Sequence, residues 1–248
     1  MTDLPPLSRA DFIERLRSEG ARRYHDLHPF HVAMHAGTLS REQLQAWVRN
    51  RYYYQTRIPI KDAIILSKSD DPAFRRLWIH RIHDHDGHDG DERSPENEGG
   101  LALWLRLADG VGLEREAVAS LREVLPGVRF ACDAYVQLVR ERSLLEAVAS
   151  SLTEFFAPDI MSRRIVAWEK HYPWVREEVL AYFRTRVTRA RSDSEEAVQY
   201  VCANARTRAE QDACVAALIR KTEILWHLLD CVSLAHGPSL SPALPGPR

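Results

Sequence analysis

Apolar positions along the chain recur at helical spacing, and alternation of apolar and polar residues, the pattern of a strand, is not convincing anywhere. Ser8 to Asp11 and Ser40 to Gln43 have the residue order of helix N-termini, in which a hydroxyl caps the first turn. Asp71-Pro72 offers a third start, a capping carboxylate before a proline suited to the first helical position. The pattern therefore predicts an all-α protein.

Glycine and proline divide this pattern into segments. Pro59 is expected to break the helix that begins after Ser40, and Pro126-Gly127 is expected to form a turn. Further helices are predicted over residues 61–66, 101–108, 130–156, from 158 to before Pro173, 175–188 and 193–235. The expected architecture is one helical bundle over residues 8–236, able to enclose a polar cavity, with a flexible segment at 1–7 and a disordered tail, rich in proline and serine, at 237–248.

Composition narrows the function classes. The formal net charge is −1 over 248 residues, which gives no bulk electrostatic case for nucleic acid or an anionic membrane. The four cysteines are far apart without C-x-x-C spacing, which argues against a structural zinc site or a disulfide framework. No signal-peptide pattern or long apolar run is present in the sequence, so a cytoplasmic location is expected.

The densest chemistry is the run of histidines and aspartates at residues 80–89. A metal site is one interpretation, because His80, Asp84 and His88 are spaced by one helical turn, but no Glu-x-x-His partner motif occurs in another predicted helix. A solvated helix end is the second interpretation, and it suits four residues: His83, His88, Asp89 and Asp91. An acid–base centre is the third; it suits His85, one turn after Arg81 and beside Asp84 and Asp86, either of which could orient the imidazole.

Other polar pairs also lie one turn apart and so share a helix face: Arg51 with Gln55, and Tyr182 with Arg186. Lys61 follows the expected break, and Lys221 lies in an apolar stretch. Each could be an ordinary surface or capping residue. Together they would suit a polyanionic, aromatic small molecule, although spacing alone leaves open whether they converge.

Several longer segments resemble one known family, the pyrroloquinoline-quinone synthases, within the haem-oxygenase-like superfamily of TenA and PqqC proteins. The likeness covers about residues 8–236. The segments that carry it are Tyr24-His25, residues 50–55 (NRYYYQ), Ile58-Pro59, Lys61-Asp62, residues 81–87 (RIHDHDG), 125–131 (LPGVRFA), 150–154 (SSLTE), 156–158 (FAP), 171–174 (HYPW), Tyr182 to Arg186, Lys221 and Ile224 to Trp226.

The resemblance implies a haem-oxygenase-like helical fold without haem, a cytoplasmic homodimer, and no metal or organic cofactor. It implies the last step of pyrroloquinoline quinone biosynthesis. In that step the tricarboxylic quinone precursor 6-(2-amino-2-carboxyethyl)-7,8-dioxo-hexahydroquinoline-2,4-dicarboxylate undergoes ring closure and oxidation by O2, with release of hydrogen peroxide.

Site residues follow from matching positions. The resemblance implies His85 as the base, and Tyr182 and Arg186 as the groups that hold oxygen or peroxide. Substrate contacts are implied for Tyr24, His25, Arg51, Gln55, Lys61, Arg81, Tyr135, Thr153, Arg164 and Lys221. One departure is Met161, which stands where the enterobacterial form has a histidine and cannot donate a strong hydrogen bond. A helical metal-dependent oxygenase and a non-catalytic carrier of the same fold remain the alternatives.

Overall fold

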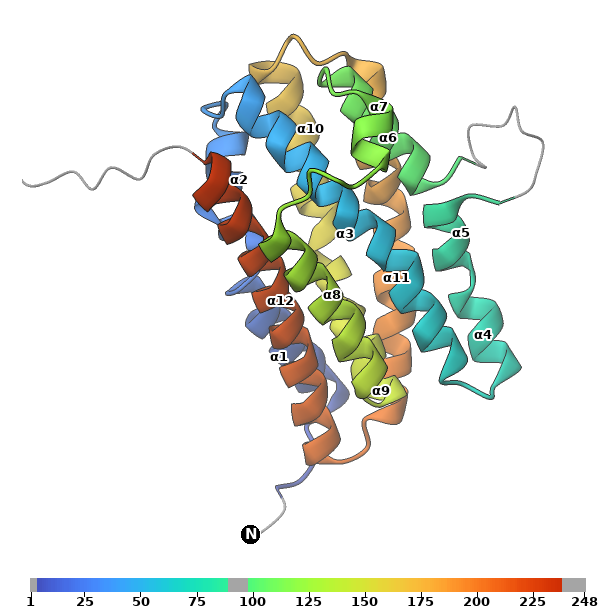
Figure 1. Ribbon diagram of the computed structural model, residues 1–248. Coiled ribbons are helices and arrows are strands. Elements are labelled where there is room, and N and C mark those ends of the chain that lie inside the picture. The colour runs from blue at the N-terminus through green and yellow to red at the C-terminus, as the bar shows by residue number, and fades with distance from the viewer. Residues whose placement is uncertain (1–3, 89–97, 238–248) are drawn as a thin grey trace, which may run out of the picture.

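The computed structural model describes residues 4–88 and 98–237, and every regular element within them is a helix (Figure 1). This confirms the predicted all-α class. The α-helices are α1 (Arg9–Ala21), α2 (Pro29–His35), α3 (Arg41–Ser67), α4 (Pro72–Trp78), α5 (His80–Asp86), α6 (Gly100–Gly110), α7 (Arg115–Ala119), α8 (Pro126–Glu141), α9 (Leu144–Ser150), α10 (Ala157–His171), α11 (Ala181–Asn204) and α12 (Arg208–His236). Short 3-10 helices are η1 (His25–Leu27), η3 (Ser151–Phe156) and η4 (Glu177–Leu180).

The predicted helix starts are confirmed where a polar side chain caps the first turn. Ser8 Oγ accepts a hydrogen bond from the N–H of Asp11 at 3.2 Å and begins α1. Ser40 and Gln43 exchange side-chain and backbone hydrogen bonds in a capping box that begins α3. The Asp71 carboxylate caps α4.

Helix α3 continues through Pro59 to Ser67, so the predicted break is wrong. A proline inside a helix removes one backbone hydrogen bond and costs about 3 kcal/mol. Pro59 is buried, and α3 packs against α5, α6, α8 and α12. This tertiary packing outweighs the local penalty, and it keeps Arg51, Gln55 and Lys61 on one continuous helix.

The single helix predicted over residues 130–156 is three elements, and the turn predicted at 126–127 is the first turn of α8. Proline fits a first turn because the N–H it lacks would have no helical partner there. Ser143 and Glu146 then form a capping box that begins α9. The 3-10 helix η3 follows and carries Ser151, Thr153 and Glu154 toward the centre of the bundle.

The helices predicted over 175–188 and 193–235 have other limits, because η4 precedes α11 and α11 continues to Asn204. The boundary with α12 is a third capping box, of the form Thr-x-x-Glu. Thr207 Oγ accepts from the Glu210 N–H at 3.2 Å, and the Glu210 carboxylate accepts from the Thr207 N–H at 2.8 Å. By contrast, the predicted helix from Pro158 to before Pro173 corresponds to α10.

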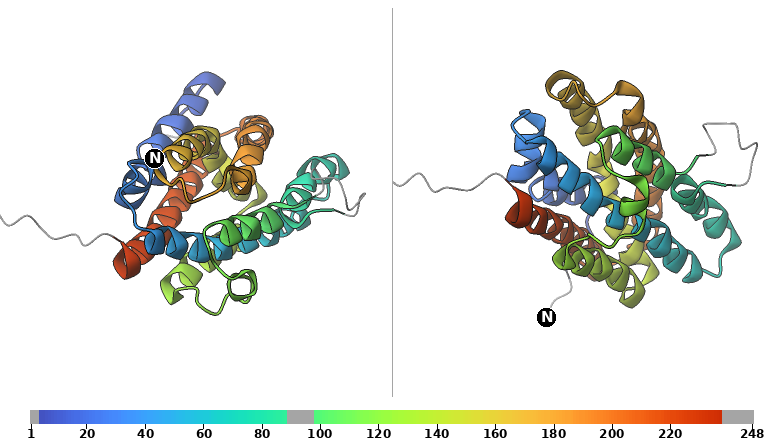
Figure 2. Two further views of the ribbon diagram at one scale, coloured as in Figure 1. Left: turned by 90° about the horizontal axis from the view of Figure 1, so that it is seen from above. Right: turned by 45° about the horizontal axis from the view of Figure 1, so that its top comes forward.

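One core joins the helices. Helix α3 packs against α8, α1 and α8 against α12, and α10 against α11, while α4 and α5 lie together at one side of the bundle (Figures 1 and 2). The buried aromatic rings of Trp47, Trp104, Trp168 and Phe183 form one connected cluster in it. None of the helices in the described residues is long and apolar enough to cross a membrane. The predicted tail lies almost wholly beyond residue 237, outside the described residues.

Candidate active site

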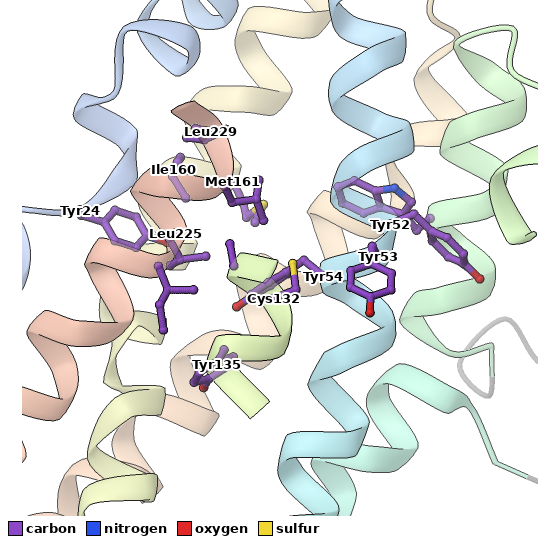
Figure 3. Packing of buried hydrophobic residues seen from close by; sticks show 14 of the residues in the cluster. Tyr24, Tyr52, Tyr53, Tyr54, Cys132, Tyr135, Ile160, Met161, Leu225 and Leu229 are labelled. Carbon is purple, nitrogen blue, oxygen red and sulfur yellow. The ribbon is translucent and has the colours of Figure 1, made fainter. Parts of the chain in front are cut away.

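A cavity of about 60 Å³ lies between α3, α8, α10, α11 and α12, and α5, η3 and the segment before α2 complete its wall. The predicted site residues in this wall are Tyr24, His25, Arg51, Lys61, His85, Tyr135, Thr153, Tyr182 and Arg186. The other wall residues are Tyr54, Ile58, Ser151, Glu154, Ala157, Met161 and Leu225. Figure 3 shows Tyr24, Tyr54, Met161 and Leu225, which come from four separate segments of the chain.

The remaining predicted residues are buried next to this wall: Gln55, Arg81, Arg164 and Lys221. Gln55 accepts a hydrogen bond from the Tyr182 hydroxyl at 2.8 Å, and Lys221 donates one to the Tyr54 hydroxyl at 2.9 Å. The structure therefore brings every sequence-predicted site residue to one place, although it does not test their individual roles.

Arg81 and His85 lie one turn apart on α5, and both are buried. Arg81 donates to the Glu154 carboxylate at 2.7 Å and to the backbone carbonyl of Asp193. His85 Nδ1 lies 3.1 Å from the Arg81 carbonyl, and because a carbonyl only accepts, Nδ1 carries the proton and Nε2 is the basic atom. Burial, followed by the charge of Arg186, lowers the pKa of His85 to about 3, so the imidazole is neutral.

The expectation that Asp84 or Asp86 orients this imidazole is wrong. Asp84 pairs with Arg189 at 3.0 Å, and Asp86 is exposed. Residues directly before and after a helical position point to other faces, whereas the group one turn earlier lies on the same face. The backbone carbonyl one turn earlier, that of Arg81, is therefore what fixes the ring of His85.

Lys61 is a charged group in the cavity wall. Its Nζ donates to the Asp62 carboxylate at 2.6 Å and to Ser151 Oγ at 3.0 Å. Burial is the largest influence and opposes the charge, but Asp62 and further anionic neighbours raise the pKa of Lys61 above its ordinary value. Asp62 is itself fixed by a hydrogen bond from the Trp78 indole at 2.9 Å, so the ammonium has a defined position.

Lys221 differs from Lys61, because no ion pair joins it to a carboxylate of the described residues. Its Nζ lies 3.2 Å from the centre of the Tyr135 ring and bonds to the Tyr54 hydroxyl. Burial, followed by the charge of Arg51, holds the pKa of Lys221 well below its ordinary range. An anionic ligand would favour the ammonium form, so this amine can gain a proton when such a ligand enters.

Tyr182 and Arg186 lie one turn apart on one face of α11, as their spacing predicts, and both line the cavity. Burial raises the pKa of Tyr182, so its hydroxyl stays protonated and can donate. Arg186 Nη2 lies 3.2 Å from the Asp193 carboxylate and 4.0 Å from that of Glu154. Its Nη1 is buried and has no hydrogen-bond partner within residues 4–88 and 98–237.

Two neutral histidines lie near the N-terminal side of the cavity. His25 Nδ1 is 3.0 Å from His31 Nδ1, and the Arg164 guanidinium lies 3.4 Å from His31 Nε2. Burial is the largest cause that lowers the pKa of both imidazoles well below 6.5 and lowers the pKa of Arg164 to about 9. Next to them, burial raises the pKa of Tyr24. This side of the cavity therefore offers hydrogen bonds and little charge of its own beyond Arg164.

Comparisons with known proteins show which family this chain belongs to. The family model described as "TENA/THI-4/PQQC family" matches residues 13–230. A pyrroloquinoline-quinone synthase of Pseudomonas aeruginosa (strain LESB58) is 50% identical over 230 residues, which are 93% of this chain and 89% of that protein. One of Rhizobium meliloti (strain 1021) is 51% identical over 228 residues, 92% of this chain and 87% of that protein. The chain belongs to the TENA/THI-4/PQQC family.

Solved structures show the family fold at low sequence identity. A domain with a heme oxygenase-like fold from Shewanella denitrificans superposes with a TM-score of 0.71 at 14% identity, covering 94% of this chain and 97% of the other. A TenA homologue from Pseudomonas syringae pv. tomato gives a TM-score of 0.69 at 13% identity, covering 94% and 99%. These likenesses confirm the predicted haem-oxygenase-like fold.

Among the wall residues that sequence reasoning did not assign to the site, Glu154 carries a carboxyl group. Burial, the largest influence, raises the pKa of its carboxyl group, although Arg81 and other cations oppose the shift. The sequence signal that could have indicated Glu154 is its place at the end of the SSLTE segment, next to the predicted site residue Thr153. Met161, the departure noted from the sequence, does lie in the wall, and its Sδ is 3.7 Å from Arg164 Nη1.

The histidine run divides in the structure. His80 Nε2 lies 3.2 Å from Asp193 and 3.6 Å from Glu196, which are on α11 rather than in the run. The three form a group with metal-ligand chemistry, but the hydrogen bond to Asp193 raises the pKa of His80, so an imidazolium also accounts for the contacts. His83 and His88 are exposed, which confirms the solvated helix end. Asp89 and Asp91 lie outside the described residues.

Proposed function

We propose that this chain is a pyrroloquinoline-quinone synthase, an oxidoreductase that performs the final step of pyrroloquinoline quinone biosynthesis. The observation that carries the proposal is the cavity itself, in which neutral His85 faces a wall containing Arg51, Lys61 and Arg186. Relatives that are about 50% identical over most of their length and bear this name support it. The substrate is the tricarboxylic quinone precursor.

The cationic wall suits three carboxylates. Arginine binds a carboxylate through two parallel hydrogen bonds, and Lys61 offers a fixed point charge. A cavity of about 60 Å³ is smaller than typical ligand pockets of roughly 300–1,000 Å³, so wall side chains move when the substrate enters. Arg81 donates a hydrogen bond to the Glu154 carboxylate, and a substrate carboxylate would take the place of Glu154 there.

Ring closure joins the substrate amine nitrogen to a carbon of its quinone ring. His85 Nε2 accepts the proton that leaves nitrogen, passes it to a quinone oxygen that becomes a hydroxyl as the ring closes, and is then free to accept the proton that leaves carbon. Tyr182 donates a hydrogen bond to a substrate oxygen. Each oxidation moves two electrons from the ring to O2, and with two protons the oxygen leaves as hydrogen peroxide. Arg186 Nη1, which has no hydrogen-bond partner among the residues that the structure describes, stabilises the negative charge that forms on oxygen.

The proposal includes chemistry without a metal or organic cofactor, because the quinone itself accepts and donates electrons. It also includes a cytoplasmic homodimer. Exposed apolar side chains on α2, α8 and α12, namely Val32, Phe130 and Leu234, would be candidates for burial between two copies.

The test is to mix the purified protein anaerobically with the quinone precursor, add oxygen, and follow the absorbance of the finished quinone. We expect binding without oxygen, product only after oxygen, and the same rate after treatment with a chelator. A protein that binds the precursor but never forms product would be a carrier. Stoichiometric iron or manganese whose removal abolishes activity would instead establish a metal-dependent oxygenase.

A further inference from the structure

Asp193 lies on α11 behind the cavity wall and joins three basic side chains. Its carboxylate lies 3.2 Å from Arg186 Nη2 on one side and 3.2 Å from His80 Nε2 on the other. Its backbone carbonyl accepts a hydrogen bond from Arg81. Asp193 is 2% exposed, so water competes little for these contacts. One residue outside the cavity therefore contacts two guanidinium groups of the candidate site.

The contact with Arg186 determines where that guanidinium points. A guanidinium is a rigid plane, so an ion pair at Nη2 also fixes the direction of Nη1. Arg186 lines the cavity, and its Nη1 has no partner within residues 4–88 and 98–237. The free donor of Arg186 is thus aimed by a carboxylate that does not itself line the cavity.

The contact with His80 holds Asp193 from the outer side. The His80 side chain is 38% exposed and faces Asp193 and Glu196 of α11. On its own helix, the charge of Arg81 lowers the pKa of His80, and Asp84 interacts electrostatically with His80 and Asp193. A divalent metal at His80, Asp193 and Glu196 would be opposed by the guanidinium already 3.2 Å from Asp193. A protonated imidazole fits these contacts without that conflict.

We infer that Asp193 is a positioning residue for the oxygen-dependent steps: it aims Arg186 Nη1 into the cavity, and His80 holds it in place from the surface side. This rests on the proposed function, in which Arg186 stabilises charge on reduced oxygen. Because the Asp193 carboxylate interacts with both His80 and Arg186, removing one of these cations strengthens its interaction with the other.

The coupling can be tested without any substrate, by NMR titration of the His80 ring. Asp193→Asn should lower the pKa of His80 toward 6.5, and Arg186→Gln should raise it, because Asp193 then has one cation fewer to neutralise it. A titration of His80 that is the same in Arg186→Gln as in the wild type would overturn the chain of contacts. This measurement stands whether or not the protein makes a quinone.

Kinetics then separate positioning from stability. Asp193→Asn should lower kcat/KM for oxygen about 10- to 100-fold and change anaerobic binding of the product quinone less than about 3-fold. Glu196→Gln is the matched control, since Glu196 is on the same helix and also contacts His80, whereas the carboxylate that pairs with Arg186 Nη2 at 3.2 Å is that of Asp193. It should keep kcat/KM for oxygen within about 2-fold.

Two results would refute positioning. One is unchanged oxygen dependence in Asp193→Asn, and the other is an equal loss of binding and oxidation, as a purely structural role predicts. If Asp193→Asn does not fold, Asp193→Glu keeps the charge and moves the carboxylate by one methylene, and the same two measurements decide. A wild-type protein that never forms product would refute the proposed function instead.

Discussion

The neutral imidazole of His85 makes folding stability depend on pH in a way that can be worked out from the structure. His85 is 4% exposed, and its pKa falls from 6.5 to about 3 because of burial and then Arg186. Below pH 6.5 the unfolded chain protonates this ring, whereas the folded protein does not until about pH 3. The contribution of His85 to stability is therefore present above pH 6.5 and lost as the pH falls toward 3.

The magnitude follows from the distance between the assay pH and 6.5. A pH of 5 is about 1.5 units below the pKa of this ring in the unfolded chain, and each unit corresponds to about 1.36 kcal/mol. The free energy of unfolding therefore falls by about 2 kcal/mol between pH 7 and pH 5 because of His85. His85→Gln removes the titrating group and keeps a side-chain donor. The free energy of unfolding, measured in urea, should therefore fall by about 2 kcal/mol less in the variant than in the wild type between these pH values.

Comparing His85→Gln with the wild type removes the pH dependence that other titrating groups contribute to both proteins. His25 and His31 are also buried and neutral, but they titrate in both proteins. The exposed His83, on the same helix, provides the control, and His83→Gln should behave as the wild type. An equal pH-dependent loss in wild type and His85→Gln would refute the reasoning, since the imidazole would then not be held neutral. In the same variant, loss of the base should slow ring closure about 10²- to 10⁴-fold.

Three further changes probe the cavity wall. Arg186→Ala should slow oxidation about 100-fold in stopped-flow mixing with oxygen while changing anaerobic product binding far less; an equal loss would assign Arg186 to a carboxylate. Lys221→Met should raise the free energy of unfolding at pH 7 by about 1 kcal/mol or more in urea, because burial in the folded protein disfavours the ammonium form, while weakening product binding; unchanged stability would contradict the lowered pKa of Lys221. Met161→His places a donor in the wall and should speed oxidation, and an unchanged oxidation rate would show that this position is dispensable.

The fold could be predicted where the signal is local. Ser8, Ser40 and Asp71 bond to the turn that follows them, so their helix starts can be found from neighbouring residues alone. The continuity of α3 through Pro59 could not, because it depends on packing against helices distant in sequence. The division of residues 130–156 falls between these cases, since the capping box at Ser143 and Glu146 is local and marks it.

The site shows the same limit. One-turn spacing correctly placed Arg81 beside His85, and Tyr182 beside Arg186, on single helix faces. The partners of these side chains come from far along the chain: Glu154 is 73 residues from Arg81, and Asp193 is 113 residues from His80. Spacing carries no information about such contacts, so the roles of Glu154 and Asp193 emerge only from the folded chain.

The small volume and the cationic wall of the cavity affect how many oxidations follow a single binding event. Its wall combines fixed cations at Arg51, Lys61 and Arg186 with little free volume. In the proposed reaction every intermediate keeps its carboxylates, so the cations retain it after each two-electron step, whereas oxygen and hydrogen peroxide are uncharged and bind these cations more weakly than a polycarboxylate does. Such a site favours processive oxidation, in which one substrate molecule meets several oxygen molecules in turn before it leaves.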